Sequence, residues 1–463
     1  MNPTSPATTT RRTFLKQTAL AGAVLGFPAI LGARNPNSRL QLAAVGLEKM
    51  GYNDVHSLAS HEKVKHVAFC DVDSTHFARA DQVTPDVPHF KDFRAMLEKL
   101  GDAIDAVSVS TPDHMHALIA IEAMKRGKHV YCQKPLAHTV WEARQMQLWA
   151  AKTGVVTQMG NQIHSRLEYR LATRLIHEGV IGKVKEVRSW QSAAGNSQTR
   201  LLEPPEPGPV PAELDWDLWI GGAPARPYAP GVYHPAAWRD WQDFGGGILG
   251  DFGCHILDPV FTALGIKAPL SVVATNSGIN RHIWPTFQTI QYVFPGNERT
   301  AGATLNVTWT DGGLQPERKL AQMPPELDLP RSGSLFIGEK GNMVLPHVGG
   351  PRLYPVENFV GFVYPKDLQG LNHWHRWVDA IIAGTKTSDG FDYAGPLTET
   401  VQLGNVATRV ARSPGKRRAK GAGRTEPNVL RWDAENCRIT NDTEANALLT
   451  KAYRRGWEVP SAS

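Results

Sequence analysis

Two glycines and an aspartate near the start of the chain have the spacing of a dinucleotide site. The turn Gly46-Leu47-Glu48-Lys49-Met50-Gly51 follows a run of strand-forming residues and precedes a helical pattern, which is where a phosphate-binding turn opens a helix. Asp71 closes the next strand-like run, 20 residues beyond Gly51, and a carboxylate there accepts hydrogen bonds from the hydroxyls of an adenosine ribose. Because its charge repels a 2′-phosphate, the pattern of Gly46, Gly51 and Asp71 predicts NAD rather than NADP.

Glu48 occupies the position of the middle glycine in that turn. A glycine there lets the backbone approach the pyrophosphate, whereas a glutamate adds bulk and negative charge beside an anion. The turn alone is therefore a weak predictor. Three consequences stay open: Glu48 weakens dinucleotide binding, tilts the pyrophosphate, or marks a chain that no longer cycles the cofactor.

Alternating β and α patterns over residues 34–160 predict the elements that position these residues. The expected strands are at residues 40–45, 67–71, 106–110, 129–131 and 155–158. The expected amphipathic helices are at residues 93–100, 116–126 and 139–152. This alternation predicts an α/β nucleotide domain with a doubly wound parallel sheet.

From residue 161 onward, strand-like runs are separated by long loops rich in proline and glycine. The runs lie at residues 184–190, 271–275, 289–294 and 304–308. Residues 161–463 are therefore predicted to form a second, α+β domain. The stretch 204–235 is too rich in proline for a regular element, and we expect it to lie as a long loop over a cleft.

The first 33 residues resemble a twin-arginine export signal. Thr10-Arg11-Arg12-Thr13-Phe14-Leu15-Lys16 is followed by an apolar stretch that reaches Ala33. The twin-arginine export machinery carries proteins that have already folded, often with a cofactor in place. We therefore expect a periplasmic protein, or a membrane-anchored one if the signal stays uncleaved.

Composition restricts the class of protein. The chain has 463 residues, of which 41% are apolar and 20% charged, and these values exclude extensive disorder and a protein with many membrane spans. Arg11, Arg12 and Lys16 supply three of the net charge of +6, and the dense basic run at residues 416–424 is interpreted as a solvated loop. No nucleic-acid partner is expected.

Three segments stand at the ends of the predicted elements. They are Ser110-Thr111-Pro112-Asp113-His114-Met115-His116, the run at residues 127–136 that contains Gln133-Lys134-Pro135, and the run at residues 245–255. In order and spacing they resemble the Gfo/Idh/MocA family of NAD(P)-dependent sugar and polyol oxidoreductases, and residues 214–221 and 391–396 are similar to its exported branch. The resemblance implies a Rossmann domain followed by an α+β domain with a large open, mostly antiparallel sheet, through which members commonly form homo-oligomers.

The resemblance also implies the catalytic residues. The family's Lys-Pro pair near the nicotinamide maps onto Lys134, and its Asp-x-x-x-His segment maps onto Asp251 and His255. His255 is then the acid/base for the substrate hydroxyl, Lys134 stabilises the developing alkoxide, and Asp251 orients the hydroxyl or the imidazole. Thr111 and Pro112 are expected to border the cofactor together with Lys134.

A carbohydrate substrate suits the residues around the predicted loop. Aromatic faces pack on the C–H faces of sugars, and amide and guanidinium groups bind hydroxyls. The candidate substrate residues are Asn161, Gln162, Tyr228, Trp238 and Arg239. The histidine pairs 114/116 and 373/375 lack carboxylates at ligand spacing, so no metal site is expected.

Three functions are compatible with these patterns. The first is an exported NAD-dependent oxidoreductase that acts on a secondary alcohol of a sugar, polyol or glycoside. The second is an NAD-dependent glycosidase or lyase in which transient oxidation permits elimination and the hydride then returns. The third, suggested by Glu48, is a sugar-binding protein without catalysis, although the retention of Lys134, Asp251 and His255 counts against it.

Overall fold

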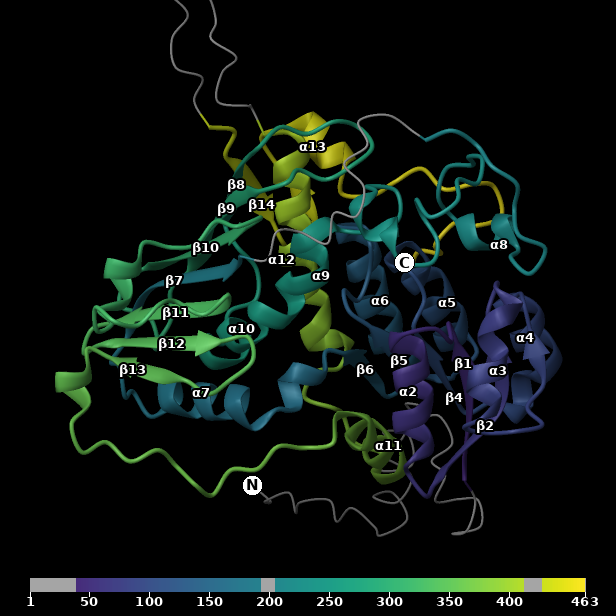
Figure 1. Cartoon of the computed structure of the whole chain (residues 1–463), viewed down its shortest axis with the longest axis horizontal. Coiled ribbons are helices and arrows are strands. Elements are labelled where there is room, and N and C mark those ends of the chain that lie inside the picture. The colour runs from purple at the N-terminus through teal and green to yellow at the C-terminus, as the bar shows by residue number, and fades with distance from the viewer. Residues whose placement is uncertain (1–38, 193–204, 412–426, 463) are drawn as a thin grey trace, which may run out of the picture.

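The computed structural model of the chain describes residues 39–192, 205–411 and 427–462. The predicted export signal at residues 1–33 and the basic run at residues 416–424 lie outside the described residues. Within the described ranges, no helix combines the length and the apolar character needed to cross a bilayer. Figure 1 shows two sheets side by side with helices between them.

The sheet nearer the N-terminus is parallel, as the sequence predicts. In the described chain it has six strands in the order β3-β2-β1-β4-β5-β6, and all neighbouring strands are parallel. The strands are β1 Leu40–Val45, β2 Val64–Cys70, β3 His89–Phe90, β4 Ala106–Val109, β5 His129–Gln133 and β6 Thr157–Gly160. The helices are α2 Met50–Ala59, α3 Phe77–Asp81, α4 Phe93–Leu100, α5 Asp113–Lys125 and α6 Val140–Thr153. The strand order reverses between β1 and β4, as in dinucleotide-binding folds.

Local chemistry explains where these elements begin and end. All residues of β4, β5 and β6 are buried, as expected for parallel strands covered on both faces. A capping box starts α6, because the Thr139 side chain accepts from Glu142 N and the Glu142 carboxylate accepts from Thr139 N, both at 3.1 Å. Gly154 ends α6 in a left-handed conformation with φ 68°.

Most of the predicted elements of this domain are confirmed, with shifted ends. Residues 93–100 form α4 as predicted, whereas α5 begins at Asp113, three residues before the predicted start at 116. Strand β2 begins at Val64 rather than at 67, and β6 begins at Thr157 rather than at 155. Short apolar runs mark the presence of an element more clearly than its ends.

The second sheet is mixed and mostly antiparallel, as the family resemblance implies. The described residues give it nine strands in the order β13-β12-β11-β7-β10-β9-β8-β14-β15, and among these pairs β7 with β10 is parallel. The strands are β7 Val184–Gln191, β8 Ser271–Asn276, β9 Gln288–Pro295, β10 Thr304–Asp311, β11 Ser332–Gly338, β12 Asn342–Pro346, β13 Arg352–Tyr354, β14 Leu430–Asp433 and β15 Arg438–Ile439. The helices are α7 Leu167–His177, α9 Gly247–Ile256, α10 Asp258–Leu264, α11 His373–Ala383, α12 Phe391–Arg409 and α13 Thr443–Ala447.

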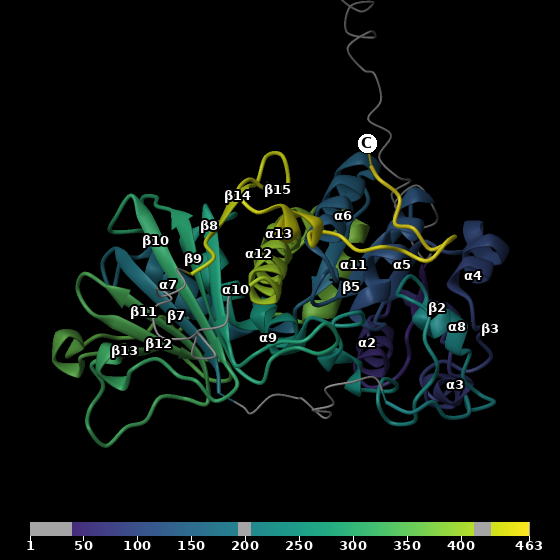
Figure 2. The ribbon, with the colours of Figure 1, turned by 90° about the horizontal axis from the view of Figure 1, so that it is seen from above.

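Helix α12 joins the two domains. Figure 2 shows α9, α10 and α12 on the side of the large sheet that is turned toward the nucleotide domain. Arg144 on α6 holds Glu399 on α12 through two parallel bonds, Nε to Oε1 at 2.7 Å and Nη2 to Oε2 at 2.8 Å. Burial raises the pKa of Glu399 while Arg144 opposes that shift. Because removing one partner of a buried pair leaves an uncompensated charge, loss of either residue would weaken the contact between α6 and α12.

The boundary between residues 160 and 161 stays a prediction, but two later segments of the chain pack against the nucleotide domain. Helix α11 packs against α2 of the nucleotide domain. Residues 449–462 run along α6, where Trp141 N donates to Leu449 O at 2.9 Å and Trp149 Nε1 donates to Pro460 O at 3.0 Å. Contacts between residues so far apart in the chain leave no local sequence signal, so the prediction missed them.

Residues 205–245, here called the lid segment, follow β7 but lie over the nucleotide domain (Figures 1 and 2). The segment is mostly loop, as predicted, with a short α-helix, α8 Trp216–Ile220, and a 3-10 turn at Ala237–Asp240. Its aromatic side chains form a separate buried cluster in which Trp216 stacks on Trp219 at 4.7 Å and Tyr233 meets Trp241 edge-on at 4.8 Å. This hydrophobic cluster within the lid segment gives a proline-rich stretch a defined shape.

Candidate active site

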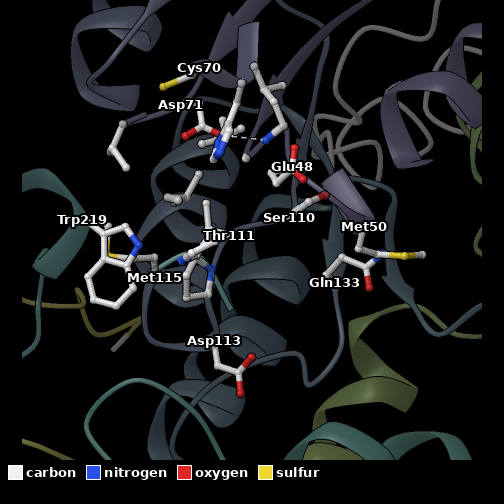
Figure 3. Close-up of a pocket in the computed structure, with 18 of the residues that line it drawn as sticks. Glu48, Met50, Cys70, Asp71, Ser110, Thr111, Asp113, Met115, Gln133 and Trp219 are labelled. Carbon is white, nitrogen blue, oxygen red and sulfur yellow. Dashed lines mark hydrogen bonds and ion pairs between the residues drawn. The ribbon is translucent and has the colours of Figure 1, made fainter. Parts of the chain in front are cut away.

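A cavity of about 330 Å³ lies at the carboxyl ends of β1, β2, β4 and β5. The turn after each of these strands lines it, Trp219 and His234 of the lid segment cover it, and His255 of α9 and Trp457 complete its wall. Figure 3 shows Asp71 and Glu48 toward one end of the cavity and Asp113 toward the other. Ligands of doubly wound sheets bind at this reversal of strand order.

The turn between β1 and α2 is packed so closely that it requires its glycines. Gly46 has φ +85°, and a Cβ there would lie 2.6 Å from Ser110 O. A Cβ on Gly51 would lie 2.2 Å from Gly46 O. Leu47 N donates to Asp71 Oδ2 at 2.8 Å and holds that carboxylate at the cavity edge. The structure therefore brings Gly46, Gly51 and Asp71 together in the arrangement that a dinucleotide needs.

Thr111 and Pro112 line the cavity beside this turn, as predicted. Thr111 Oγ1 is buried and has no hydrogen-bond partner among the residues that the structure describes. Lys49 and Met50, at the start of the ten-residue helix α2, also line the cavity. A glycine turn before a helix N-terminus, a ribose carboxylate and an unpartnered hydroxyl are features that fit NAD.

Glu48, which replaces the middle glycine of the phosphate-binding turn, lines the cavity. Its carboxylate belongs to an acidic edge: burial opposes a charge on His76, but Asp71, Asp73 and Glu48 together raise the pKa of that imidazole. An acidic edge at the adenosine end disfavours a 2′-phosphate, which agrees with NAD rather than NADP.

Three charged side chains from three elements meet at the other end of the cavity. Lys134 Nζ, after β5, lies 2.7 Å from Asp251 Oδ1 of α9, and Arg239 Nε of the lid segment lies 3.2 Å from the same oxygen. Burial disfavours the ionised carboxylate, but Lys134 and Arg239 outweigh it and hold the pKa of Asp251 well below its usual value. Lys134 and Arg239 line the cavity, so Asp251 acts by holding two cations at the wall.

His255 lies one helical turn after Asp251 and lines the cavity. Its Nδ1 bonds to Asn161 Oδ1, and Asn161 Nδ2 donates to Cys254 O at 3.0 Å. Because the amide is oriented by that second bond, Nδ1 of His255 carries the proton and Nε2 is the acceptor. Burial, and then Lys134, lower the pKa of His255 well below its usual value, so the imidazole is neutral at neutral pH.

The predicted substrate residues separate into two groups. Gln162, Trp238 and Arg239 line the cavity, and the Arg239 guanidinium stacks over the Trp238 ring at 4.2 Å. Asn161 is instead fully buried behind His255 and positions that ring. Tyr228 lies in the lid cluster, edge-on to Trp216 at 5.2 Å. Neither Asn161 nor Tyr228 lines this cavity, so their assignment to the substrate stays a prediction.

Asp113 is a residue of this site that the sequence prediction did not select. It is the first residue of α5, it is 4% exposed, and it lines the cavity. Gly246 N donates to its Oδ2 at 3.3 Å. Burial raises the pKa of Asp113 to about 7, although Arg239 and Lys134 oppose the shift. The sequence does contain a local signal for Asp113, because this acidic residue directly follows Thr111 and Pro112 after the end of β4.

The histidines considered as metal pairs have protein partners. His114 Nε2 bonds to Trp219 O at 2.9 Å, His116 bonds to two backbone carbonyls at 2.8 Å, and His373 Nε2 bonds to Met159 O at 3.0 Å. Within the described part of the chain, a different group has its donor atoms within 4.8 Å of one another: Asp73, His76 and His234. Because His234 is 161 residues from Asp73, spacing in the sequence could not reveal this group.

Two family models match the chain in succession. Residues 40–161 match the oxidoreductase family, NAD-binding Rossmann fold, and residues 188–298 match the C-terminal alpha/beta domain of the same oxidoreductase family. The chain belongs to the Gfo/Idh/MocA family. Its nucleotide domain is accordingly an NAD-binding Rossmann domain, and the glycine turn and Asp71 described above lie inside the matched region.

Curated relatives of this Gfo/Idh/MocA protein have names from carbohydrate chemistry. A 1,5-anhydro-D-fructose reductase of Ensifer adhaerens is 35% identical over 121 residues, which is 26% of this chain and 36% of that protein. A glycosyl hydrolase family 109 protein of Shewanella putrefaciens is 29% identical over 154 residues, 31% of this chain and 33% of that protein. A levoglucosan dehydrogenase of Pseudarthrobacter phenanthrenivorans is 30% identical over 156 residues, 34% of this chain and 32% of that protein. The chain thus matches about a third of the length of these relatives.

Solved structures share the fold over most of the chain. The WlbA dehydrogenase from Bordetella pertussis, in complex with NADH and UDP-GlcNAcA, superposes with a TM-score of 0.55 at 17% identity. The match covers 80% of this chain and 97% of that one. At this identity the likeness shows the fold of the Gfo/Idh/MocA protein.

Proposed function

We propose that the protein is an exported NAD-dependent oxidoreductase that oxidises a secondary alcohol of a sugar, polyol or glycoside. One observation carries the proposal: the Lys134 ammonium and the His255 imidazole open onto the same cavity as the glycine turn and Asp71. Relatives named as a reductase and a dehydrogenase of anhydrosugars support the substrate class.

The residues divide the work of alcohol oxidation. The glycine turn and Asp71 would hold NAD, which would supply the acceptor for the hydride of the carbinol carbon. His255 Nε2 takes the hydroxyl proton, since Nδ1 is committed to Asn161 and the lowered pKa keeps the ring neutral. The Lys134 ammonium, fixed by Asp251, donates to the same oxygen and stabilises the negative charge that develops there. Gln162, Trp238 and Arg239 supply a sugar-binding wall around that point.

The first experiment asks whether the protein carries its cofactor. Protein purified from the envelope is denatured and the supernatant is assayed for NAD(H) by mass spectrometry, after which sugars and polyols are screened for formation of NADH. The proposal predicts near-stoichiometric NAD and reduction by at least one carbohydrate. Absence of dinucleotide, together with no binding on titration, would leave the sugar-binding alternative suggested by Glu48.

A redox-assisted glycosidase or lyase is the second candidate. The glycosyl hydrolase family 109 relative favours it, and oxidation of a neighbouring carbinol acidifies a C–H bond enough for elimination of the glycosidic oxygen. The two candidates separate by product: net reduction of an acceptor supports the oxidoreductase, whereas glycoside cleavage at constant total NADH supports the glycosidase.

Export through the twin-arginine route is part of the same proposal. Replacing Arg11 and Arg12 by lysine keeps the charge but removes the paired guanidinium groups. We expect the double variant to stay in the cytoplasm while the parent reaches the periplasm, as measured by fractionation. Equal export of both proteins would overturn the twin-arginine route, and a parent that stays in the cytoplasm would overturn the localisation. Light scattering on the purified parent tests the homo-oligomer expected from the open sheet.

A further inference from the structure

The lid segment is tied to the nucleotide domain along the edge that carries Asp71. Two backbone hydrogen bonds join them: Asp215 N donates to Val72 O at 2.9 Å and Ser74 N donates to Glu213 O at 3.1 Å, and together they make an antiparallel bridge between Asp73 and Leu214. These contacts place residues 213–215 beside the turn that follows β2. The lid segment therefore closes the cavity on its adenosine side.

A side-chain pair fastens the second half of the lid segment to the same turn. His234 Nε2 lies 2.9 Å from Asp73 Oδ2, and both side chains are largely buried. Asp73 is itself held, because its Oδ1 accepts from Thr75 N at 3.0 Å and from Thr75 Oγ1 at 2.6 Å. The pair therefore joins a fixed point of the nucleotide domain to a residue of the cavity roof.

His76 links this pair to the predicted ribose carboxylate. Its Nδ1 lies 3.1 Å from Asp71 Oδ2 and its Nε2 lies 3.7 Å from Asp73 Oδ2, and its ring is 5.7 Å from that of His234. Asp71, His76, Asp73 and His234 thus form one continuous chain of polar contacts from the NAD site to the lid segment. Both His76 and His234 line the cavity.

We propose that the Asp73–His234 pair is a latch that keeps the lid segment over the adenosine end of the NAD site and sets the rate at which NAD enters and leaves. The inference rests on the proposed function only in requiring that NAD occupy the cavity. NAD has to pass the same edge in both directions, so loss of the latch speeds release and entry together. The dissociation constant then changes by less than either rate. Such a latch lets a cofactor remain bound through many turnovers.

The test compares rates of NAD exchange in the full-length protein. Asp73→Asn keeps an oxygen for the Thr75 contacts but removes the charge, and His234→Ala removes the partner. Protein loaded with radiolabelled NAD is chased with unlabelled NAD, and retained label is measured by filter binding. Each single variant is expected to release NAD about tenfold faster than the parent, as for loss of one charge-assisted bond. The double variant should be no more than about twofold faster than the faster single variant, because both changes remove one interaction.

A matched control lies on the same domain away from the lid segment. His89 Nε2 lies 2.8 Å from Asp81 Oδ1, so His89→Asn breaks a similar pair without touching the lid, and its exchange rate should stay within about twofold of the parent. Parental rates in Asp73→Asn and His234→Ala, with NAD still bound, would overturn the latch but leave the proposed function intact. Failure of the parent to bind NAD at all would overturn both.

A chelator separates the latch from a metal site with the same donors. Asp73, His76 and His234 offer a carboxylate and two imidazoles within 4.8 Å, a set that zinc also uses. Exchange from the parent is therefore repeated in EDTA, and zinc is assayed by mass spectrometry. Unchanged exchange supports the hydrogen-bonded latch. Faster exchange in EDTA, with stoichiometric zinc in the untreated protein, would overturn it in favour of a metal clasp.

Discussion

The two ends of the cavity are built in different ways. At the nucleotide end, Gly46, Gly51 and Asp71 belong to one domain, and backbone geometry does most of the work: two positions without Cβ and one carboxylate held by a backbone amide. At the catalytic end, side chains from a strand end, a helix and the lid segment are held by ion pairs and amide bonds. A binding site for an invariant cofactor can be local, whereas a reaction centre is assembled from distant segments.

The difference implies unequal sensitivity to substitution. Changes at the nucleotide end alter how tightly NAD binds and leave the chemistry intact. Changes at the catalytic end alter rates and leave NAD in place, because their partners lie across the cavity from Asp71. Each prediction below therefore pairs a rate with a measurement of bound NAD.

His255→Gln should have the largest effect. Removing the base that accepts the hydroxyl proton lowers kcat by about 10²- to 10⁴-fold, while the NAD content measured by mass spectrometry stays near that of the parent. The neighbouring His347, whose ring is 5.5 Å away, provides the control, since His347→Gln should change kcat by less than about threefold. Comparable losses in both variants would show that the effect is one of packing.

Asp251→Asn should reduce kcat/KM by about 10- to 100-fold. The variant leaves Lys134 and Arg239 without the shared carboxylate that holds them 2.7 and 3.2 Å from its Oδ1. Steady-state kinetics and NAD content give the measurement. Asp311→Asn is the control. Asp311 is a buried carboxylate of β10, and its partners Trp309 and Gln288 lie in the same large sheet, outside the cavity lining. An unaltered kcat/KM in Asp251→Asn would falsify its positioning role.

Glu48→Gly should tighten NAD binding by about fivefold, which corresponds to about 1 kcal/mol from removing a negative charge near a helix N-terminus. Glu48→Gln separates the two causes, since it removes the charge and keeps the bulk. Isothermal titration of protein freed of NAD provides the dissociation constants, and kcat should stay near the parental value. Weaker binding in Glu48→Gly would mean that the carboxylate contributes to the turn.

The smallest effect is expected from pH. As the pH falls from 6.5 toward the lowered pKa of His255, kcat/KM should hardly change. Oxidation needs the neutral imidazole, so the rate falls only when acid reaches that pKa, which burial and Lys134 place well below the usual value. An inflection near pH 7 would instead belong to Asp113, whose pKa burial raises to about 7. Asp113→Asn should abolish such an inflection. If the inflection persists in that variant, His255 rather than Asp113 is the group that titrates.

The fold was more predictable than the site. Alternating strand and helix patterns predicted the parallel sheet, because burial imposes a period on the chain that the sequence retains, whereas the family resemblance implied the large second sheet. The family motifs predicted Lys134, Asp251 and His255, and the structure brings these residues together. Asn161 and Tyr228 were assigned to substrate because polarity and aromatic character do not distinguish a ligand contact from a supporting one. Trp457 was missed because it meets the cavity only through the fold, and Asp113 was not selected although it follows Thr111 and Pro112 directly.

Trp457 has a consequence for how the protein matures. The cavity wall contains both Gly46 and Trp457, which are separated by more than 400 residues of chain. During synthesis the glycine turn therefore emerges long before the tryptophan that completes its enclosure. A nucleotide domain that has folded early presents a site open on that side, and the wall there is completed only after Trp457 has been translated. Enclosure of the glycine turn thus follows its own synthesis by more than 400 residues, and exchange of NAD after that point passes the lid segment.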